Sequence, residues 1–226
     1  MKRILLAGAT LLALTAAQPT LAADAPVYKG PAPAAVALFN WSGLYIGGTV
    51  GAHWGDNHYF NPGGPFTSET YNVSGTIAGV TVGFNWQAPG SSLVLGVEGD
   101  WSWSSAKVTY TTGCVPPCTE NWPWIATIRG RLGWAADRIL FFVTGGAAFS
   151  EINGTQPGFG STGQKNINGW TIGGGVEWAV WDRLSVKVEY LYFDFGNPVI
   201  FNPIVATPIT YFPREHVARV GANWRF

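Results

Sequence analysis

Nine charged side chains are the residues of this chain whose types and spacing could do chemistry. Several stand two positions apart within short apolar segments, as Glu98 and Asp100 do. Alternate residues of a β-strand point to opposite faces, so such pairs share one face. The set has four acids and five bases: Glu98, Asp100, Glu177, Glu189, Arg129, Arg131, Lys187, Arg219 and Arg225. Buried charges persist only when they are paired and hydrogen-bonded. We therefore expect an internal network of ion pairs.

The histidines offer no catalytic pair along the sequence. A nucleophile and its base must lie within hydrogen-bond reach, which on one strand face means residues two apart. None of His53, His58 and His216 has a serine at that spacing. Partners distant in sequence stay open, but we expect that the protein is not an enzyme.

Cys114 and Cys118 flank the segment Val115-Pro116-Pro117. Two cysteines in an exported protein favour a disulfide. A metal site is the alternative, but the sequence shows only two soft ligands here, and His58 would have to join from another loop. We expect the disulfide and no bound metal.

The N-terminus has the pattern of a secretory signal peptide. Residues 1–3 are basic at Lys2 and Arg3, residues 4–17 are apolar, and Thr20-Leu21-Ala22 supplies small residues before a cut after Ala22. The apolar stretch is shorter than the roughly 20 residues of a spanning helix. We expect residues 1–22 to be removed and the Ala/Pro-rich residues 23–40 to form a periplasmic lead-in.

The composition is unusual for a soluble domain. Charged residues make up 12% of the chain and aromatic residues 15%, with 12 tryptophans, whereas soluble domains have about 25% charged residues. Without Lys2 and Arg3, 11 basic residues stand against 13 acidic ones, a net charge of −2. This balance gives no reason to expect a nucleic-acid partner. The remaining options are a soluble β-sandwich and a barrel with lipid outside.

Eight segments alternate apolar and polar residues with the period of a β-strand. They are Gly43–Trp54, Val73–Trp86, Leu93–Trp103, Trp122–Ala135, Ile139–Ser150, Gly169–Trp181, Leu184–Gly196 and Arg214–Phe226. The seventh is irregular, because Leu191, Phe193 and Phe195 continue the face that carries Lys187 and Glu189. Either a bulge lies there or the strand has left the bilayer.

The connections between these segments decide between sandwich and barrel. Long connections (55–72, 105–121, 151–168 and 197–213) alternate with short ones (87–92, 136–138 and 182–183). Long loops at one end, tight turns at the other and an even strand number are typical of outer-membrane barrels. We therefore predict an all-β fold over residues 41–226, an eight-stranded antiparallel up-and-down transmembrane β-barrel.

The tryptophans and the lumen fit this prediction. Tryptophans gather at the turn-side ends of strands (Trp86, Trp134, Trp181, Trp224) and at the loop-side ends (Trp54, Trp101, Trp103, Trp124, Trp170). Two such groups are typical of the aromatic girdles at the bilayer interfaces. An eight-stranded barrel is only wide enough for its own side chains. We expect the charge network to plug it, with a narrow ion pore as the alternative.

Short motifs in these segments resemble the small outer-membrane barrels of alphaproteobacteria, a group labelled porin-family or opacity-type surface proteins. The motifs are Asn40-Trp41-Ser42-Gly43-Leu44-Tyr45-Ile46-Gly47-Gly48, Gly96-Val97-Glu98-Gly99-Asp100, Gly130-Arg131-Leu132-Gly133, Val143-Thr144-Gly145-Gly146-Ala147, Val186-Lys187-Val188-Glu189-Tyr190-Leu191-Tyr192 and Val220-Gly221-Ala222-Asn223-Trp224-Arg225-Phe226. The resemblance covers nearly all of the mature chain and implies a surface-exposed envelope protein in the outer membrane. Some relatives bind haemin.

The expected function is structural: the barrel contributes to envelope integrity and presents four surface loops. Its expected partners are outer-membrane lipid, lipopolysaccharide and the barrel-assembly machinery, because the terminal pattern Trp224 and Phe226 resembles the signal which that machinery reads. A receptor for haemin or a host ligand is the alternative. His58 and Tyr59 in the first long connection could ligate haemin iron, although a single loop histidine is more often solvated. The sequence leaves the oligomeric state open.

Overall fold

A computed structural model of the chain describes residues 39–60, 68–111, 117–156, 161–202 and 207–226. These residues form strands and turns, and none of them belongs to a helix that could cross a bilayer. The strands are β1 (Gly43–Phe60), β2 (Ser68–Gln87), β3 (Leu93–Tyr110), β4 (Cys118–Ala136), β5 (Ile139–Gln156), β6 (Ser161–Ala179), β7 (Leu184–Asp194), β8 (Val199–Asn202) and β9 (Thr207–Arg225).

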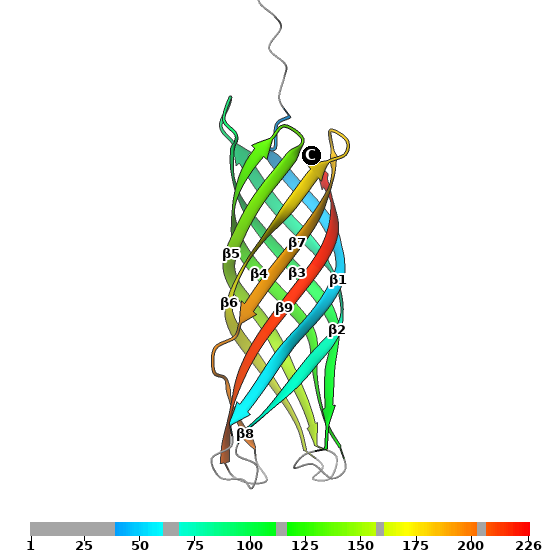
Figure 1. The fold of residues 1–226 in the computed structure, drawn as a ribbon, viewed down its shortest axis with the longest axis vertical. Helices are drawn as coiled ribbons and strands as arrows, with labels where there is room; N and C mark the ends of the chain where they lie inside the picture. Colours follow the sequence, from blue (N-terminus) through cyan, green and yellow to red (C-terminus); the bar gives the residue numbers. More distant parts are fainter. Residues whose placement is uncertain (1–38, 61–67, 112–116, 157–160, 203–206) are drawn as a thin grey trace, which may run out of the picture. The chain divides into compact units, whose positions relative to one another are not determined.

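Eight of the strands close into one antiparallel barrel (Figure 1). Each strand from β1 to β7 pairs with the next, β7 pairs with β9, and β9 closes the sheet on β1. The short β8 pairs only with β9 and forms a hairpin outside the closed wall. The predicted eight-stranded antiparallel barrel is therefore confirmed.

The strands continue well into the segments predicted as long loops. β1 continues to Phe60, β5 continues to Gln156, and β6 already begins at Ser161. At about 3.3 Å per residue and a tilt of roughly 40°, the 20 residues of β2 rise about 50 Å. The apolar band of an outer-membrane barrel is only about 25 Å tall. The loop-side half of the wall therefore projects beyond the bilayer, where lipid no longer requires apolar residues on the outer face.

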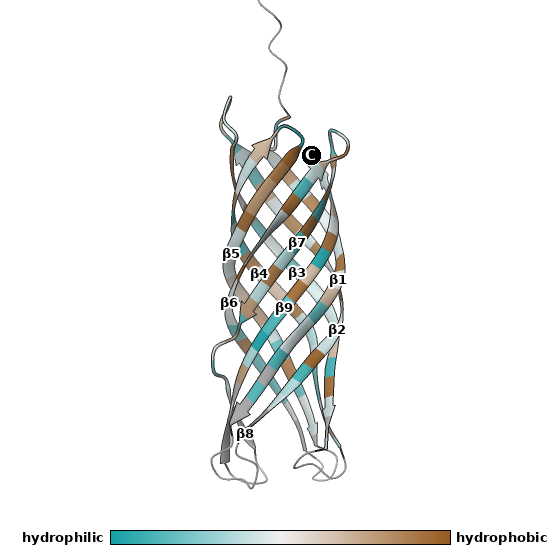
Figure 2. Ribbon diagram, viewed as in Figure 1, coloured by the Kyte–Doolittle hydropathy of each residue, from teal (hydrophilic) through white to brown (hydrophobic). Residues whose placement is uncertain are grey.

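Hydrophobic and hydrophilic residues alternate along many of the strands (Figure 2), and the exposed fractions show that the two faces of the wall differ as predicted. Large apolar side chains are exposed on the outside, for example Val97, Ile128 and Val188. Exposed tryptophans lie near both ends of this apolar surface, among them Trp134 and Trp103. An exposed apolar surface of this size on a single chain is expected only where lipid covers it.

The irregular seventh segment contains no bulge. β7 keeps continuous register with β6 and with β9 over its whole length. Leu191 and Phe193 point inward and are buried, like Lys187 and Glu189 before them. The register shifts lie instead in β3 between Trp103 and Ala106, and in β4. Of the two explanations offered for this segment, the bulge is therefore wrong.

Candidate functional site

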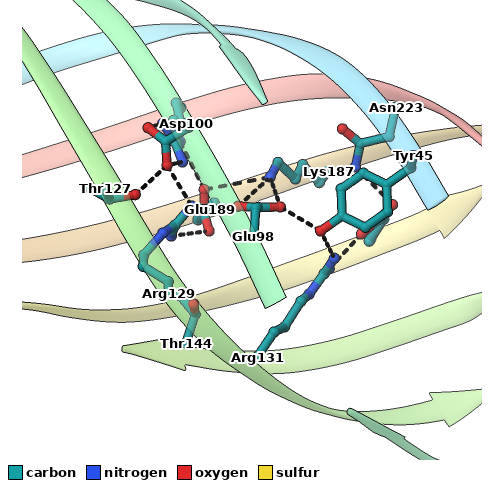
Figure 3. A network of polar contacts seen from close by, with 12 residues as sticks. Tyr45, Glu98, Asp100, Thr127, Arg129, Arg131, Thr144, Lys187, Glu189 and Asn223 are labelled. Carbon is teal, nitrogen blue, oxygen red and sulfur yellow. Dashed lines mark hydrogen bonds and ion pairs between the residues drawn. The ribbon is translucent and has the colours of Figure 1, made fainter. Parts of the chain in front are cut away.

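A charge cluster fills the middle of the barrel, with Arg129 of β4 at its centre (Figure 3). Its Nη1 donates to Glu189 Oε1 at 2.8 Å, and its Nη2 donates to Asp100 Oδ2 at 2.9 Å and to Glu98. All four side chains are less than a tenth exposed. One guanidinium thus joins carboxylates from β3 and β7, across the lumen.

Two further cations complete this cluster. Lys187 Nζ donates to Glu98 Oε2 at 2.9 Å. Arg219 donates to Glu189 Oε2 at 2.7 Å and to Asp100 Oδ1 at 3.0 Å. Three carboxylates therefore face three cations, so the cluster is neutral and each carboxylate has at least two cationic partners. This multiple pairing is what makes buried charge tolerable in a low-dielectric interior.

A second ion pair lies nearer the turn end. Arg131 pairs with Glu177, whose Oε1 accepts from Ser185 Oγ at 2.5 Å and from Asn223 Nδ2 at 3.0 Å. Tyr45 links the two groups, because its hydroxyl donates to Glu98 Oε2 at 2.7 Å and accepts from Arg131 Nη1 at 3.3 Å. A Cβ at Gly83 would lie 2.3 Å from the Tyr45 ring, so this glycine gives the ring its space.

Arg225, the ninth predicted network residue, is buried but forms no ion pair within the described part of the chain. Its guanidinium lies 4.5 Å from the Phe39 ring centre and 4.6 Å from that of Trp41, and donates to Asn40 O at 3.1 Å. The structure therefore connects eight of the nine charged side chains, through ion pairs and through the Tyr45 hydroxyl. It places Arg225 against residues 39–41, which precede β1.

Trp41 closes the turn end of the lumen. Its side chain is fully buried against Val94 and Leu140, and its Nε1 donates to Asp137 O at 2.9 Å. Its backbone nitrogen donates to Gln87 Oε1 at 2.8 Å. No alternation pattern pointed to this role, because Trp41 precedes the first strand. A fixed indole across the mouth leaves little room for water.

An apolar core fills the lumen at the loop end. Its buried members come from seven strands, β2 to β7 and β9, and include Ile77, Trp122, Ile152, Phe193 and Val217. Trp122 points inward because of the register shift in β4. The lumen thus has three layers: an apolar layer at the turn end, the ion pairs, and this apolar core.

A buried histidine lies among the inward residues of the loop-side half, and the sequence reasoning missed its partners. His53 of β1 contacts Ser104 Oγ through Nδ1 at 2.7 Å and Glu215 Oε2 through Nε2 at 3.0 Å. The search for pairs two apart on one strand overlooked partners on β3 and β9. His53 and Glu215 have fully enclosed side chains, so their contact lies inside the wall, away from solvent.

His58 and Tyr59 lie on β1 and not in a loop, which corrects the prediction. His58 Nδ1 lies 3.1 Å from Thr70 Oγ1 on β2, and its ring packs 5.8 Å from Phe212. Tyr59 pairs through its backbone with Tyr211, and its side chain is outside the described residues. The polar sequence around His58 suggested a loop, but the extended wall continues through it. Over the described residues, no group of three metal-binding side chains occurs.

The remaining predicted residues lie at the strand ends. Cys118 begins β4 and is buried, whereas Cys114 is outside the described residues, so their disulfide stays a prediction. Trp224 and Phe226 are exposed at the turn end, where Phe226 N donates to Leu44 O at 3.0 Å. An exposed terminal ring is compatible with either a girdle residue or a recognition signal.

Comparison with known proteins identifies the family. Residues 8–226 match the model of the outer membrane protein beta-barrel domain. The chain belongs to this family. It is 30% identical to the 31 kDa outer-membrane immunogenic protein of Brucella melitensis, over the full length of both chains. It is 31% identical to the 22 kDa outer membrane protein of Rhizobium leguminosarum, over 70% of this chain and 66% of that protein.

This family membership places the protein in the outer membrane. The resemblance to small alphaproteobacterial barrels is confirmed by the Brucella and Rhizobium relatives. Among solved structures, Neisserial surface protein A aligns with a TM-score of 0.48 and 13% identity, over 82% of this chain and 98% of that one.

Proposed function

We propose that this protein is a structural component of the outer membrane, without enzymatic or transport activity, that contributes to envelope integrity and presents four surface loops. The observation that carries the proposal is the filled lumen. Ion pairs occupy its middle, Trp41 closes one end, and an apolar core closes the other. The wall has lipid-facing aromatic residues outside and no open path inside. Such a barrel is suited to strengthening a membrane rather than to carrying solutes across it.

We propose lipid and lipopolysaccharide as its partners in the membrane. Export and assembly are part of the same proposal. Residues 1–22 act as the signal peptide, and the barrel-assembly machinery recognises the terminal strand through Trp224 and Phe226. The immunogenic Brucella relative supports the surface display of loops in this family.

A haemin receptor is the less well supported alternative. Haemin carries two propionates, and the outer wall near His58 has one cation, Arg214, between two carboxylates. Arg214 pairs in register with Asp56 on one side and Asp194 on the other. The local charge is therefore negative, which disfavours an anionic ligand.

The experiment that tests the structural role is a deletion strain. We expect the deletion to increase uptake of a hydrophobic dye that an intact outer membrane excludes, and a plasmid-borne copy to restore exclusion. Purified protein should also run faster on a gel unboiled than boiled, because a closed barrel stays compact in detergent. Normal dye exclusion in the deletion strain would contradict the envelope role.

A further inference from the structure

A hollow of 670 Å³ lies on the outer wall of the barrel, on its loop-side half. This volume is within the range of about 300–1,000 Å³ that small-molecule sites occupy. It is lined by Asp56, His58, Tyr192, Phe212, Arg214 and His216. All six occupy even positions of β1, β7 and β9, and odd positions of the same strands, such as His53, Phe193 and Glu215, are buried inside. The hollow therefore opens outward and not into the lumen.

The base of the hollow is continuous with the aromatic girdle. The His216 ring stacks on Trp54, with centroids 5.8 Å apart and planes at 14°. Its Nδ1 lies 2.6 Å from the Tyr190 hydroxyl, and the Tyr192 ring is 5.3 Å away. Because girdle aromatics lie at the headgroup level, the hollow begins where the bilayer ends. Figure 1 shows the chain turning away from the barrel wall after β7.

The charges of this hollow select against an anionic occupant. Arg214 lies between Asp56 and Asp194 in neighbouring strands, and it is exposed. The connections predicted at 55–72 and 197–213 contain no lysine or arginine. The lining itself holds one guanidinium and one carboxylate, and Asp194 stands next to Arg214 outside it, so the hollow has no excess positive charge to attract a phosphate. Carboxylate and guanidinium groups side by side do supply both acceptors and donors for hydroxyl groups.

We propose that this hollow binds a neutral sugar ring in the headgroup of an outer-leaflet glycolipid. The aromatic rings of Tyr192 and Phe212 supply apolar surface for the faces of the sugar, and Asp56 and Arg214 supply hydrogen bonds to its hydroxyls. A lipid-linked sugar fits better than a free one, because the hollow adjoins the girdle, where a headgroup is already held. The inference rests on the proposed envelope role, and it assigns that role a specific lipid contact.

Retention of lipid by the refolded protein tests this inference. The protein is reconstituted in phosphatidylcholine nanodiscs that contain either a dialkyl maltoside or phosphatidylglycerol, and bound lipid is counted by native mass spectrometry. We expect the wild type to retain the maltoside lipid in preference to phosphatidylglycerol. Arg214→Gln and Phe212→Ala should each lower its retention by about tenfold, the usual effect of losing a charge-assisted hydrogen bond or a packed ring.

The matched control is Lys107→Gln, which removes another exposed cation on the wall, on β3 and outside the hollow. This variant should retain lipid like the wild type. The shift in gel mobility on boiling verifies that each variant is folded. Equal retention by Arg214→Gln, Phe212→Ala and the wild type, or a preference for phosphatidylglycerol, would overturn the proposal. Binding of free maltotriose as tight as that of the lipid would overturn the lipid-linked source.

Failure of this inference is distinguishable from failure of the envelope role. If the hollow binds no glycolipid, the in vitro retention shows no preference, while the deletion strain still takes up dye. If the envelope role is wrong, the deletion strain excludes dye normally, whatever the nanodisc experiment shows. The two measurements share no readout.

Discussion

Replacing Arg129 with alanine should destabilise the barrel by about 3–5 kcal/mol, the usual cost of leaving a buried charge without its partner. Arg129 is almost fully buried and contacts three carboxylates, Glu98, Asp100 and Glu189. After the change, these three face only Lys187 and Arg219. The cluster then carries one uncompensated negative charge inside the wall, with no bulk water to stabilise it.

The complementary change, Glu98→Ala, should be destabilising for the opposite reason. It removes one carboxylate contact from Arg129 and one from Lys187, and it leaves one excess positive charge in the cluster. The double variant Arg129→Ala/Glu98→Ala restores neutrality. Its loss of stability should therefore be smaller than the sum of the two single losses, because residues in one ion-pair network do not act additively.

Urea unfolding of the refolded protein in detergent measures these effects. With a denaturant slope of about 2 kcal/mol per molar, a loss of about 4 kcal/mol lowers the unfolding midpoint by about 2 M. Arg138→Ala is the matched control, because Arg138 pairs with Asp182 at 2.8 Å on the exposed surface. That pair should contribute only about 0–1 kcal/mol.

One result would refute the reasoning. If Arg129→Ala and Glu98→Ala unfold at the same urea concentration as Arg138→Ala, the lumen charges are solvated and the interior is wet. The filled-lumen argument for a structural role would then be lost, and a conducting pore would become the better explanation.

Three further predictions follow from the same structure. Refolded protein should give no steady conductance in planar bilayers, and reproducible single-channel steps would show that the lumen is open. Deleting Phe226 should abolish surface display in cells while the purified chain still folds in detergent; normal outer-membrane levels of the deletion variant would leave Phe226 as a girdle residue only. Haemin should keep its free Soret band when the protein is added, and a shift that weakens in His58→Ala would restore the receptor alternative.

The sequence was sufficient to predict the barrel and to predict which residues of the barrel strands face the lumen and which face lipid. Alternation has a period of two in any strand, so Glu98 and Asp100 had to share a face, and lipid outside required that face to be the lumen. The structure buries both. The number of strands followed from the eight alternating segments, and the alternation of long and short connections favoured a barrel over a sandwich; neither step requires knowledge of packing.

Contacts between distant strands could not be predicted in this way. His53, Ser104 and Glu215 come from three strands, and their meeting depends on how these strands pair around the closed barrel. Trp41 stands before the first strand, so no periodic pattern includes it. Register shifts and entering segments depend on the closed three-dimensional wall, and alternation in one dimension carries no information about them.

The irregular face of β7 has a physical explanation that unites these observations. Within the bilayer, lipid contacts Val186 and Val188 outside, and the lumen can hold the paired charges of Lys187 and Glu189. Beyond the girdle the outside meets water, and the wall then needs an apolar interior, as any water-soluble barrel does. The inward face of β7 changes accordingly from charged to apolar at Leu191, without any change in register.

The outward face changes in the opposite direction at the same level. Val188 is followed by Tyr190, Tyr192 and Asp194. Amphipathicity therefore inverts along one continuous strand, at the height where the girdle aromatics lie. A pattern search with a fixed inner and outer polarity must misinterpret such a strand as a bulge. Conversely, such an inversion can be recognised in a sequence. The period stays two, but apolar residues begin to occupy the face that carried the charged residues, and this position marks the level at which the strand leaves the membrane.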